Sequence, residues 1–270
     1  MLLNLATYRF VDLQNLPELK AQFEAWGQQF QLKGTVLLAD EGINSFICCT
    51  LESFEGLQKK LNRDPRLAGL DWKESLSETQ SFKRWKVKIK PEIVTFKKDG
   101  IRPGQKRAES VSPTTLKRWL DQGHDDQGKP VRLLDTRNDF EVAQGTFEQA
   151  LNPDIQKFSD LPVWIAEQGE SLKNERIVSF CTGGIRCEKS ALYMAAQGYD
   201  NISQLEGGVL RYFEEVGTDH WRGSLFVFDD RRGVDPALKS IKEAYQNEVD
   251  QIADSTFETA FRAAPSKATS

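Results

Sequence analysis

The residue best placed to do chemistry is Cys181, which follows the apolar, strand-like segment 176–180 and opens the loop Cys-Thr-Gly-Gly-Ile-Arg-Cys. Two glycines allow a tight backbone turn, and a helical pattern begins directly afterwards at Ile185. This arrangement directs backbone N–H groups and a helix N-terminus toward the sulfur. Arg186 adds a permanent positive charge. Because these groups favour the thiolate, we predict that Cys181 has a lowered pKa and acts as a nucleophile.

The candidate active-site loop contains seven consecutive residues: Cys181, Thr182, Gly183, Gly184, Ile185, Arg186 and Cys187. Its amide groups would also bind a small anion, such as a persulfide or an oxyanion. Cys187 falls in the first helical turn, where it is either a resolving thiol for oxidised Cys181 or a small core residue.

Other cofactor chemistries lack the residues that they need. The chain has two histidines, His124 and His220, and no pair of Cys-x-x-Cys motifs, so we expect no metal site. It contains neither a phosphate-binding P-loop nor a dinucleotide-binding fingerprint, and we recognise no organic cofactor. Cys48 and Cys49 are adjacent in a strand-like segment and point to opposite faces, which favours packing of reduced thiols over a disulfide.

Composition favours a soluble, cytoplasmic protein without a membrane partner. Apolar residues make up 39% of the chain and charged residues 28%, as in ordinary globular proteins. The N-terminus shows no basic region followed by an apolar run, and no apolar stretch is long enough to span a bilayer.

Positive charge gathers in one segment although the formal net charge of the chain is −4. Ten basic residues between positions 83 and 107 face only two acidic ones, Glu92 and Asp99. Such a cluster is either a solvated face or a contact surface for a nucleic-acid backbone. The basic residues are Lys83, Arg84, Lys86, Lys88, Lys90, Lys97, Lys98, Arg102, Lys106 and Arg107.

The N-terminal part of the chain shows a β-α-β-β-α-β pattern. Strand-like segments cover 2–10, 34–39 and 43–49, helical periodicity covers 16–31 and 50–61, and a fourth strand is expected between 70 and 89. This order is typical of the ferredoxin-like (acylphosphatase-like) α+β domain, which would close near residue 95. Asn15 and Thr50 are the expected helix caps. In 85–90, lysines alternate with apolar residues, which predicts one charged and one buried face.

The rest of the chain alternates between strands and helices after a basic linker at 96–111. Strands are expected at 131–134, 176–180 and 202–205, and helices at 112–121, 185–197 and 208–215. This α/β alternation over 112–222 predicts a parallel sheet covered by helices on both faces. Asp135 and Cys181 would then flank one cleft, with Asp135 and Arg137 as a structural ion pair. Residues 223–270 are expected to form a mostly helical extension with a disordered end.

Three motifs in this second region resemble the rhodanese family. Four residues separate Cys181 from Arg186, as in that family, whereas cysteine phosphatases place five between them. The other two motifs are Asp135-Thr136-Arg137 followed by Glu141 and Gly145, with Thr146 in place of the usual histidine, and Leu205-Glu-Gly-Gly-Val209. The resemblance implies a rhodanese-like catalytic domain over about 112–222.

Over residues 1 to about 235 the chain resembles the oxygen-dependent tRNA uridine hydroxylases. The matching blocks are Gly34–Asn44, Lys86–Thr95 and the loop Cys-Thr-Gly-Gly-Ile-Arg-Cys-Glu-Lys. The resemblance implies hydroxylation of the wobble uridine in the tRNA anticodon to 5-hydroxyuridine, with O2 as co-substrate and Cys181 as the essential residue. Many members carry further cysteines after the Phe-Val-Phe-Asp stretch that begins here at Phe226, and this chain has none there.

Two other functions are compatible with the same residues. A rhodanese-type sulfurtransferase would use Cys181 to carry a persulfide, and a non-catalytic tRNA-binding module would not need its thiol. The N-terminal domain and its basic strand favour the hydroxylase. In that function the expected tRNA-binding residues are Lys83, Arg84, Lys86, Lys88, Lys90, Lys97 and Lys98, and no obligatory protein partner is evident.

Overall fold

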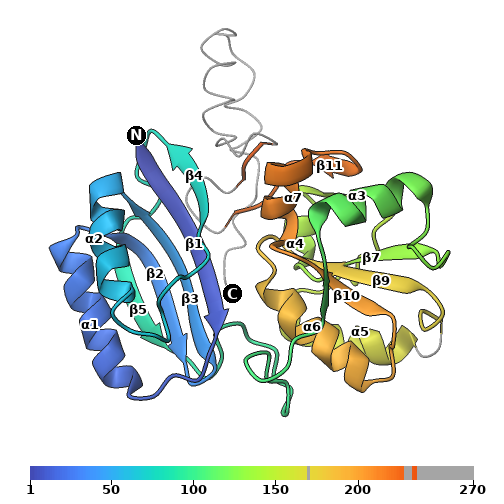
Figure 1. The fold of residues 1–270 in the computed structure, drawn as a ribbon, viewed down its shortest axis with the longest axis horizontal. Helices are drawn as coiled ribbons and strands as arrows, with labels where there is room; N and C mark the ends of the chain where they lie inside the picture. The colour runs from blue at the N-terminus through green and yellow to red at the C-terminus, as the bar shows by residue number, and fades with distance from the viewer. Residues whose placement is uncertain (169–170, 228–232, 236–270) are drawn as a thin grey trace, which may run out of the picture.

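The structure, a computed structural model, describes residues 1–168, 171–227 and 233–235 as two α/β units that lie side by side (Figure 1). Most of the predicted C-terminal helical extension falls on residues 236–270, outside the described residues. Within the described ranges, no helix is both long enough and apolar enough to serve as a membrane span.

The N-terminal unit has the predicted ferredoxin-like order of elements, followed by one further strand. Its elements are β1 (Leu2–Phe10), α1 (Leu16–Gln29), β2 (Lys33–Ala39), β3 (Gly42–Cys49), α2 (Leu51–Leu61), β4 (Lys73–Ser77) and β5 (Trp85–Ile89). The sheet order is β4-β1-β3-β2-β5, antiparallel except where β5 runs parallel to β2.

The prediction of a single strand between 70 and 89 is wrong. β4 extends the sheet beside β1, whereas β5 pairs with β2 at the opposite edge. One strand cannot serve both edges, and the polar segment 78–84 carries the chain from one edge to the other. The predicted alternation of β5 also fails at Ile89, which is 43% exposed because it ends an edge strand that only β2 flanks.

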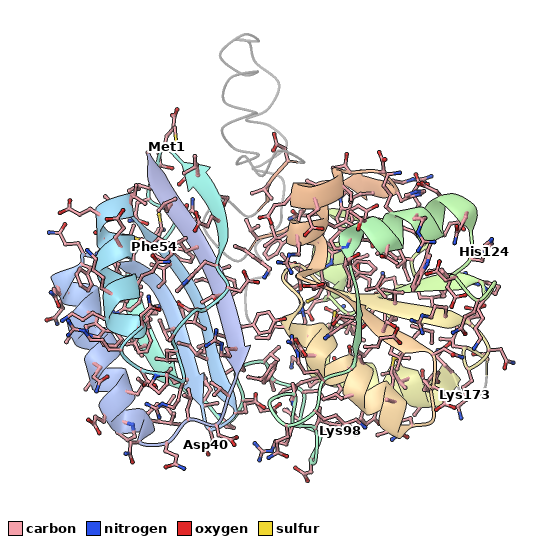
Figure 2. The ribbon with its side chains drawn as sticks, viewed as in Figure 1. Met1, Asp40, Phe54, Lys98, His124 and Lys173 are labelled. Atoms are coloured by element: carbon pink, nitrogen blue, oxygen red, sulfur yellow. The ribbon has the colours of Figure 1, made fainter. Side chains whose placement is uncertain are left out.

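Helices α1 and α2 cover one face of this sheet, and the other face turns toward the second unit (Figures 1 and 2). Phe23 of α1 and Leu57 of α2 pack with Val36 and Ile47 in one core. Thr50 caps α2 as predicted, because its hydroxyl accepts a hydrogen bond from the N–H of Ser53 at 3.2 Å. The predicted side-chain cap at Asn15 is absent, since that residue is left-handed (φ 55°) and makes no such bond.

The second unit contains the predicted parallel sheet, in the order β6-β10-β9-β7. Its strands are β6 (Glu109–Val111), β7 (Val131–Asp135), β9 (Arg176–Phe180) and β10 (Ile202–Leu205), and β8 (Gly145–Phe147) pairs separately with β11 (Trp221–Gly223). The helices are α3 (Pro113–Gln122), α4 (Asp139–Val142), α5 (Leu161–Gln168), α6 (Ile185–Ala196) and α7 (Gly208–Val216), with a short 3-10 turn at Phe158–Asp160.

Alternate strand residues enter two separate cores, so both faces of the sheet are covered as predicted. Leu133 and Val178 pack on the side of α3 and α7. Leu134 and Ile177 pack on the side of α5 and α6. A strand buried on both faces needs apolar residues on both, which explains its near-continuous apolar sequence.

The segment predicted as a linker is anchored at both of its ends. Phe96 is 0% exposed and stacks on Phe158 of the second unit, with ring centroids 4.8 Å apart. At the other end, residues 109–111 form β6, an edge strand of the parallel sheet. The polar composition of 96–111 hid the two apolar anchors, Phe96 and Val111. Because β6 is part of the parallel sheet, the second unit begins before residue 112.

Candidate active site

The loop between β9 and α6 holds Cys181 where the sequence predicts it. Gly184 is left-handed (φ 98°), and its N–H donates to the sulfur of Cys181 at 3.1 Å. A Cβ at this position would lie 2.9 Å from the hydroxyl of Tyr8 in the N-terminal unit. Glycine is therefore required both by the backbone conformation and by the close approach of the other unit.

The surroundings of Cys181 favour its thiolate, in agreement with the sequence prediction. The residue is 0% exposed, and burial by itself raises the pKa of a thiol. A hydrogen bond from Cys187, the positive charge of Arg186 and the backbone N–H groups of Arg186 and Gly184 outweigh burial and lower the pKa of Cys181 to about 5. The pKa of Cys187 is raised by burial and by the neighbouring Cys181, so its thiol stays protonated and can donate.

The pKa of Cys181 predicts a distinctive titration. The thiolate absorbance in the far ultraviolet that Cys181→Ser removes should appear with a midpoint near pH 5 and stay constant through neutrality. The sign follows because a lowered pKa keeps the sulfur ionised until the pH falls below that value. Cys48→Ser, outside the loop, should leave the transition in place. A midpoint at the ordinary value of about 8.5 would contradict the prediction.

A buried ion pair fixes Arg186. Its two Nη atoms donate to the two carboxylate oxygens of Glu141 at 2.6 and 2.8 Å, and both residues are buried. Burial lowers the pKa of Arg186, but the charge of Glu141 outweighs it, so the guanidinium stays charged. Glu141 of α4 therefore holds in place the cation that stabilises the Cys181 thiolate. A bidentate pair also sets the plane of the guanidinium.

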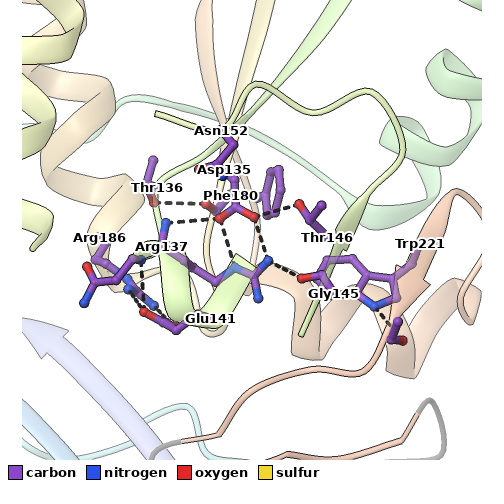
Figure 3. A network of polar contacts seen from close by, with 12 residues as sticks. Asp135, Thr136, Arg137, Glu141, Gly145, Thr146, Asn152, Phe180, Arg186 and Trp221 are labelled. Atoms are coloured by element: carbon purple, nitrogen blue, oxygen red, sulfur yellow. Dashed lines mark hydrogen bonds and ion pairs between the residues drawn. The ribbon is translucent and has the colours of Figure 1, made fainter. Parts of the chain in front are cut away.

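A second buried ion pair, between Asp135 and Arg137, lies near the pair of Arg186 and Glu141 (Figure 3). Arg137 donates to Asp135 at 2.9 and 2.6 Å and to the carbonyl oxygen of Gly145 at 2.7 Å. Thr146, at the position where related proteins usually carry histidine, donates to Asp135 at 2.8 Å. The guanidinium lies 5.1 Å from the ring centroid of Trp221. Since Asp135 and Arg137 have no exposed surface, they form the structural pair that the sequence predicts.

Cys181 lines a cleft between the two units. The prediction that Asp135 flanks the same cleft is wrong, because Asp135 is fully buried in its pair with Arg137 and does not line it. Sequence reasoning also missed that the N-terminal unit supplies one wall. One wall is the open face of the N-terminal sheet, with Asn4, Tyr8 and Phe46. The other wall is formed by the Cys181 loop and by α7, which contributes Leu210 and Glu214. The cleft encloses about 880 Å³, counting the space open to solvent, and its walls are largely apolar.

Lys189, in the second turn of α6, joins the two units. It is 2% exposed, and its Nζ donates to Glu41 at 2.8 Å, to Glu92 at 2.6 Å and to the carbonyl oxygen of Val94 at 3.1 Å. The next residue toward Cys181, Glu188, pairs with Arg107. Sequence reasoning missed this junction. In the sequence, Glu41 lies in the block Gly34–Asn44 and Lys189 ends the block that begins at Cys181. Nothing in the sequence indicates that these two residues are in contact.

The basic residues separate in space. Lys83, Arg84 and Lys86 line a depression with Thr35 and Phe82, and Phe82 also lines the Cys181 cleft. Lys98 instead lies 5.7 Å from the ring centroid of Tyr193 in the second unit. The structure therefore brings the first three toward the cleft and places Lys98 at the junction of the units.

Strand register connects β5 to the wall of the cleft. Lys86 lies opposite Thr35, which lies opposite Phe46 in the next strand. Lys88 lies opposite Leu37, which lies opposite Asn44. Cross-strand partners share a face of a sheet, so the exposed lysines of β5 and the cleft wall belong to one surface. Within the described residues, no three metal-binding side chains gather together.

Comparison with known proteins places these features in a family. Residues 2–93 match the UPF0176 acylphosphatase-like domain, and residues 112–215 match the rhodanese-like domain. The fold and the Cys181 loop thus define a rhodanese-like protein with an acylphosphatase-like N-terminal domain. The "tRNA uridine(34) hydroxylase" of Cupriavidus pinatubonensis is 50% identical over 238 residues, which are 88% of this chain and 84% of the relative. The chain belongs to the tRNA uridine(34) hydroxylase family.

Two further proteins are similar over different lengths of the chain. The protein of the same name from Bordetella petrii is 52% identical over 235 residues, covering 87% of this chain and 93% of its own. Among solved structures, a Saccharomyces cerevisiae homolog of single-domain rhodanese aligns with 41% of this chain and 83% of its own, at 19% identity and a TM-score of 0.35.

Proposed function

We propose that this protein hydroxylates the wobble uridine of tRNA to 5-hydroxyuridine, with O2 as co-substrate and with the Cys181 thiolate in contact with the base. Family membership supports the reaction and the tRNA substrate. The observation that carries the proposal is the position of the Cys181 thiolate in a cleft whose opposite wall continues into an exposed basic strand.

A thiolate suits chemistry at C5 of uracil. C6 of the ring is electrophilic because its double bond is conjugated with the C4 carbonyl, and addition of sulfur there transfers electron density to C5. C5 then becomes the nucleophilic atom that attacks O2, which gives a C5 hydroperoxide. Two electrons and two protons from an external thiol reductant cleave its O–O bond, so that one oxygen stays as the hydroxyl and the other leaves as water. The sulfur leaves as C5 loses its proton and the double bond re-forms. Such addition requires a sulfur that is ionised at neutral pH, and the lowered pKa of Cys181 meets this requirement.

The basic residues of the N-terminal unit would bind the phosphate backbone near the anticodon. In this proposal Lys83, Arg84, Lys86 and Lys88 contact phosphates along the β5 edge, and Lys90 and Lys97 follow them along the chain. Lys98 lies apart from this surface, at the junction of the units. Anticodon bases can be turned out of their stack, so a single base can enter the cleft without melting a duplex. Phe82 lies between the depression and the cleft and offers a ring on which a base can stack.

The function is tested by deleting the gene and analysing tRNA nucleosides by mass spectrometry. Nucleosides derived from 5-hydroxyuridine should disappear in a strain without a redundant pathway. They should return when the wild-type gene is expressed in air, but not when the same cells grow without oxygen. Unchanged nucleosides in the deletion strain would reject the function, and restoration under anoxia would reject O2 as the co-substrate.

Removing the basic depression should weaken tRNA binding. The triple variant Lys83→Ala, Arg84→Ala, Lys86→Ala should lower the affinity for tRNA by about tenfold or more. It should also reduce the slope of affinity against salt concentration by about one for each phosphate that the variant no longer binds. Fluorescence anisotropy at several salt concentrations measures both. The matched control is Lys59→Ala, Lys60→Ala in α2, on the opposite face of the sheet. Equal weakening in both variants would contradict the assignment.

A further inference from the structure

The cleft wall contains a buried acceptor with no partner in the part of the chain that the structure describes. Asn4 of β1 lines the cleft and is 4% exposed. Its Nδ2 donates to the hydroxyl of Ser77 at 2.8 Å, whereas its Oδ1 accepts no hydrogen bond. On the opposite wall, the buried hydroxyl of Thr182 also has no partner there. Buried polar atoms are nearly always paired, so two such atoms in one cleft point to a polar ligand.

Hydrogen-bond donors and acceptors fix which way the Asn4 amide points. The hydroxyl of Ser77 has a single proton, which it donates to the carbonyl oxygen of Thr79 at 2.8 Å. Toward Asn4 it can therefore only accept, so the amino group of Asn4 must face it. With the amide reversed, two oxygens would meet with no proton between them. The amide of Asn4 is thus held with Oδ1 free to accept from a ligand.

We propose that Asn4 is a specificity-determining residue whose Oδ1 accepts a hydrogen bond from N3–H of the substrate uracil. This inference rests on the proposed function. Uracil carries a proton on N3, whereas cytosine presents a lone pair at the same position. Cytosine would therefore meet the buried Oδ1 acceptor against acceptor, and both atoms would stay unpaired. The cleft then selects uracil over cytosine by one hydrogen bond rather than by shape.

Entry of the base requires a side chain to move. Oδ1 of Asn4 has less than 1 Å² of exposed surface, so an incoming base must displace a neighbouring side chain before it reaches this atom. Phe82, from the irregular segment between β4 and β5, lines the same cleft. Within the proposal, Phe82 is the side chain that moves, and its ring then lies beside the entering nucleotide.

The test compares anticodon stem-loops that differ only at nucleotide 34, which is uridine, cytidine or 3-deazauridine. The last has nearly the size of uridine but carries C–H in place of N3–H and a hydroxyl in place of the C4 carbonyl, and it is used in mildly acidic solution, where that hydroxyl is protonated. Binding is measured without oxygen, so that no turnover occurs. The wild-type protein should bind the uridine stem-loop about 10- to 100-fold more tightly than the other two, because neither carries an N–H at ring position 3 to donate to the buried acceptor. Asn4→Ala should bind all three within about threefold.

Two outcomes would overturn the inference. Equal binding of uridine and 3-deazauridine by the wild-type protein would show that N3–H is not recognised, and this comparison needs no variant to fold. Undiminished preference for uridine in Asn4→Ala would show that another group recognises it. Asn62→Ala, outside the cleft, should keep the full preference. Failure of the proposed function is distinguishable, because it appears as unchanged nucleosides in the deletion strain.

Discussion

Cells that carry Cys181→Ser in place of the wild-type gene are expected to contain no 5-hydroxyuridine derivatives in their tRNA. A serine hydroxyl is not ionised at neutral pH, so the nucleophile is removed although its size and position are kept. Removing a catalytic nucleophile typically lowers turnover by about 10³-fold or more. The fold should survive, because Gly184 can donate to the serine oxygen as it does to the sulfur. Mass spectrometry of tRNA nucleosides, with protein levels checked by immunoblot, measures the result.

The control for this experiment is Cys48→Ser, which introduces the same change at a fully buried cysteine of β3 outside the loop. It should leave tRNA modification intact. Normal modification with Cys181→Ser would instead favour the non-catalytic tRNA-binding module. If the protein were a sulfurtransferase, the purified wild-type protein would transfer sulfur from thiosulfate to cyanide, and Cys181→Ser would not. We expect no such transfer, because Glu141 already binds both Nη atoms of the arginine that would hold an anionic donor.

Lys189→Met is expected to lower the stability of the protein strongly. The substitution keeps most of the side-chain volume but leaves Glu41 and Glu92 without their shared cation at the junction of the two units. Removing one partner of a buried ion pair costs about 3–5 kcal/mol. For a domain of this size, a loss of about 3 kcal/mol lowers the unfolding temperature by about 6–12 °C. Differential scanning calorimetry measures the shift.

Lys117→Met offers a matched control on the surface. Lys117 also binds two carboxylates, Asp121 at 2.8 Å and Asp219 at 3.1 Å, but all three side chains are in contact with solvent. Water screens surface pairs, which therefore contribute little to stability, so the unfolding temperature should hardly change. Equal shifts in the two variants would show that the buried contacts of Lys189 add nothing to the junction.

Glu92 gives the same junction a pH dependence. Burial raises its pKa, but the bonds from Lys189 and from the N–H groups of Phe96 and Lys97 outweigh this, and the net pKa is lowered. A lowered carboxyl pKa contributes stability that is complete above the ordinary value of about 4.3 and is lost as the pH falls through the folded-state value. The difference in the free energy of unfolding between the wild-type protein and Lys189→Met should therefore become smaller in acid.

Short-range patterns predicted much of the fold. Apolar spacing located the helices and most strands, and Thr50 caps its helix as predicted because its hydroxyl is within reach of the backbone N–H three residues later. The predictions that were wrong concern features that depend on contacts between residues far apart in the sequence. Whether residues 73–89 form one strand or two depends on which edges of the sheet are open. The apolar anchors Phe96 and Val111 were hidden by their polar neighbours.

The sequence by itself determined the Cys181 loop, because its glycines, arginine and helix start are neighbours in the chain and act over a few ångströms. Only the tertiary structure decided what surrounds the sulfur. Glu141 reaches Arg186 across 45 residues, and Lys189 reaches Glu41 across 148. Asn4 likewise enters the cleft from the start of the chain. Contacts between residues so far apart leave no periodic pattern, since their pairing depends on how two folded units pack together.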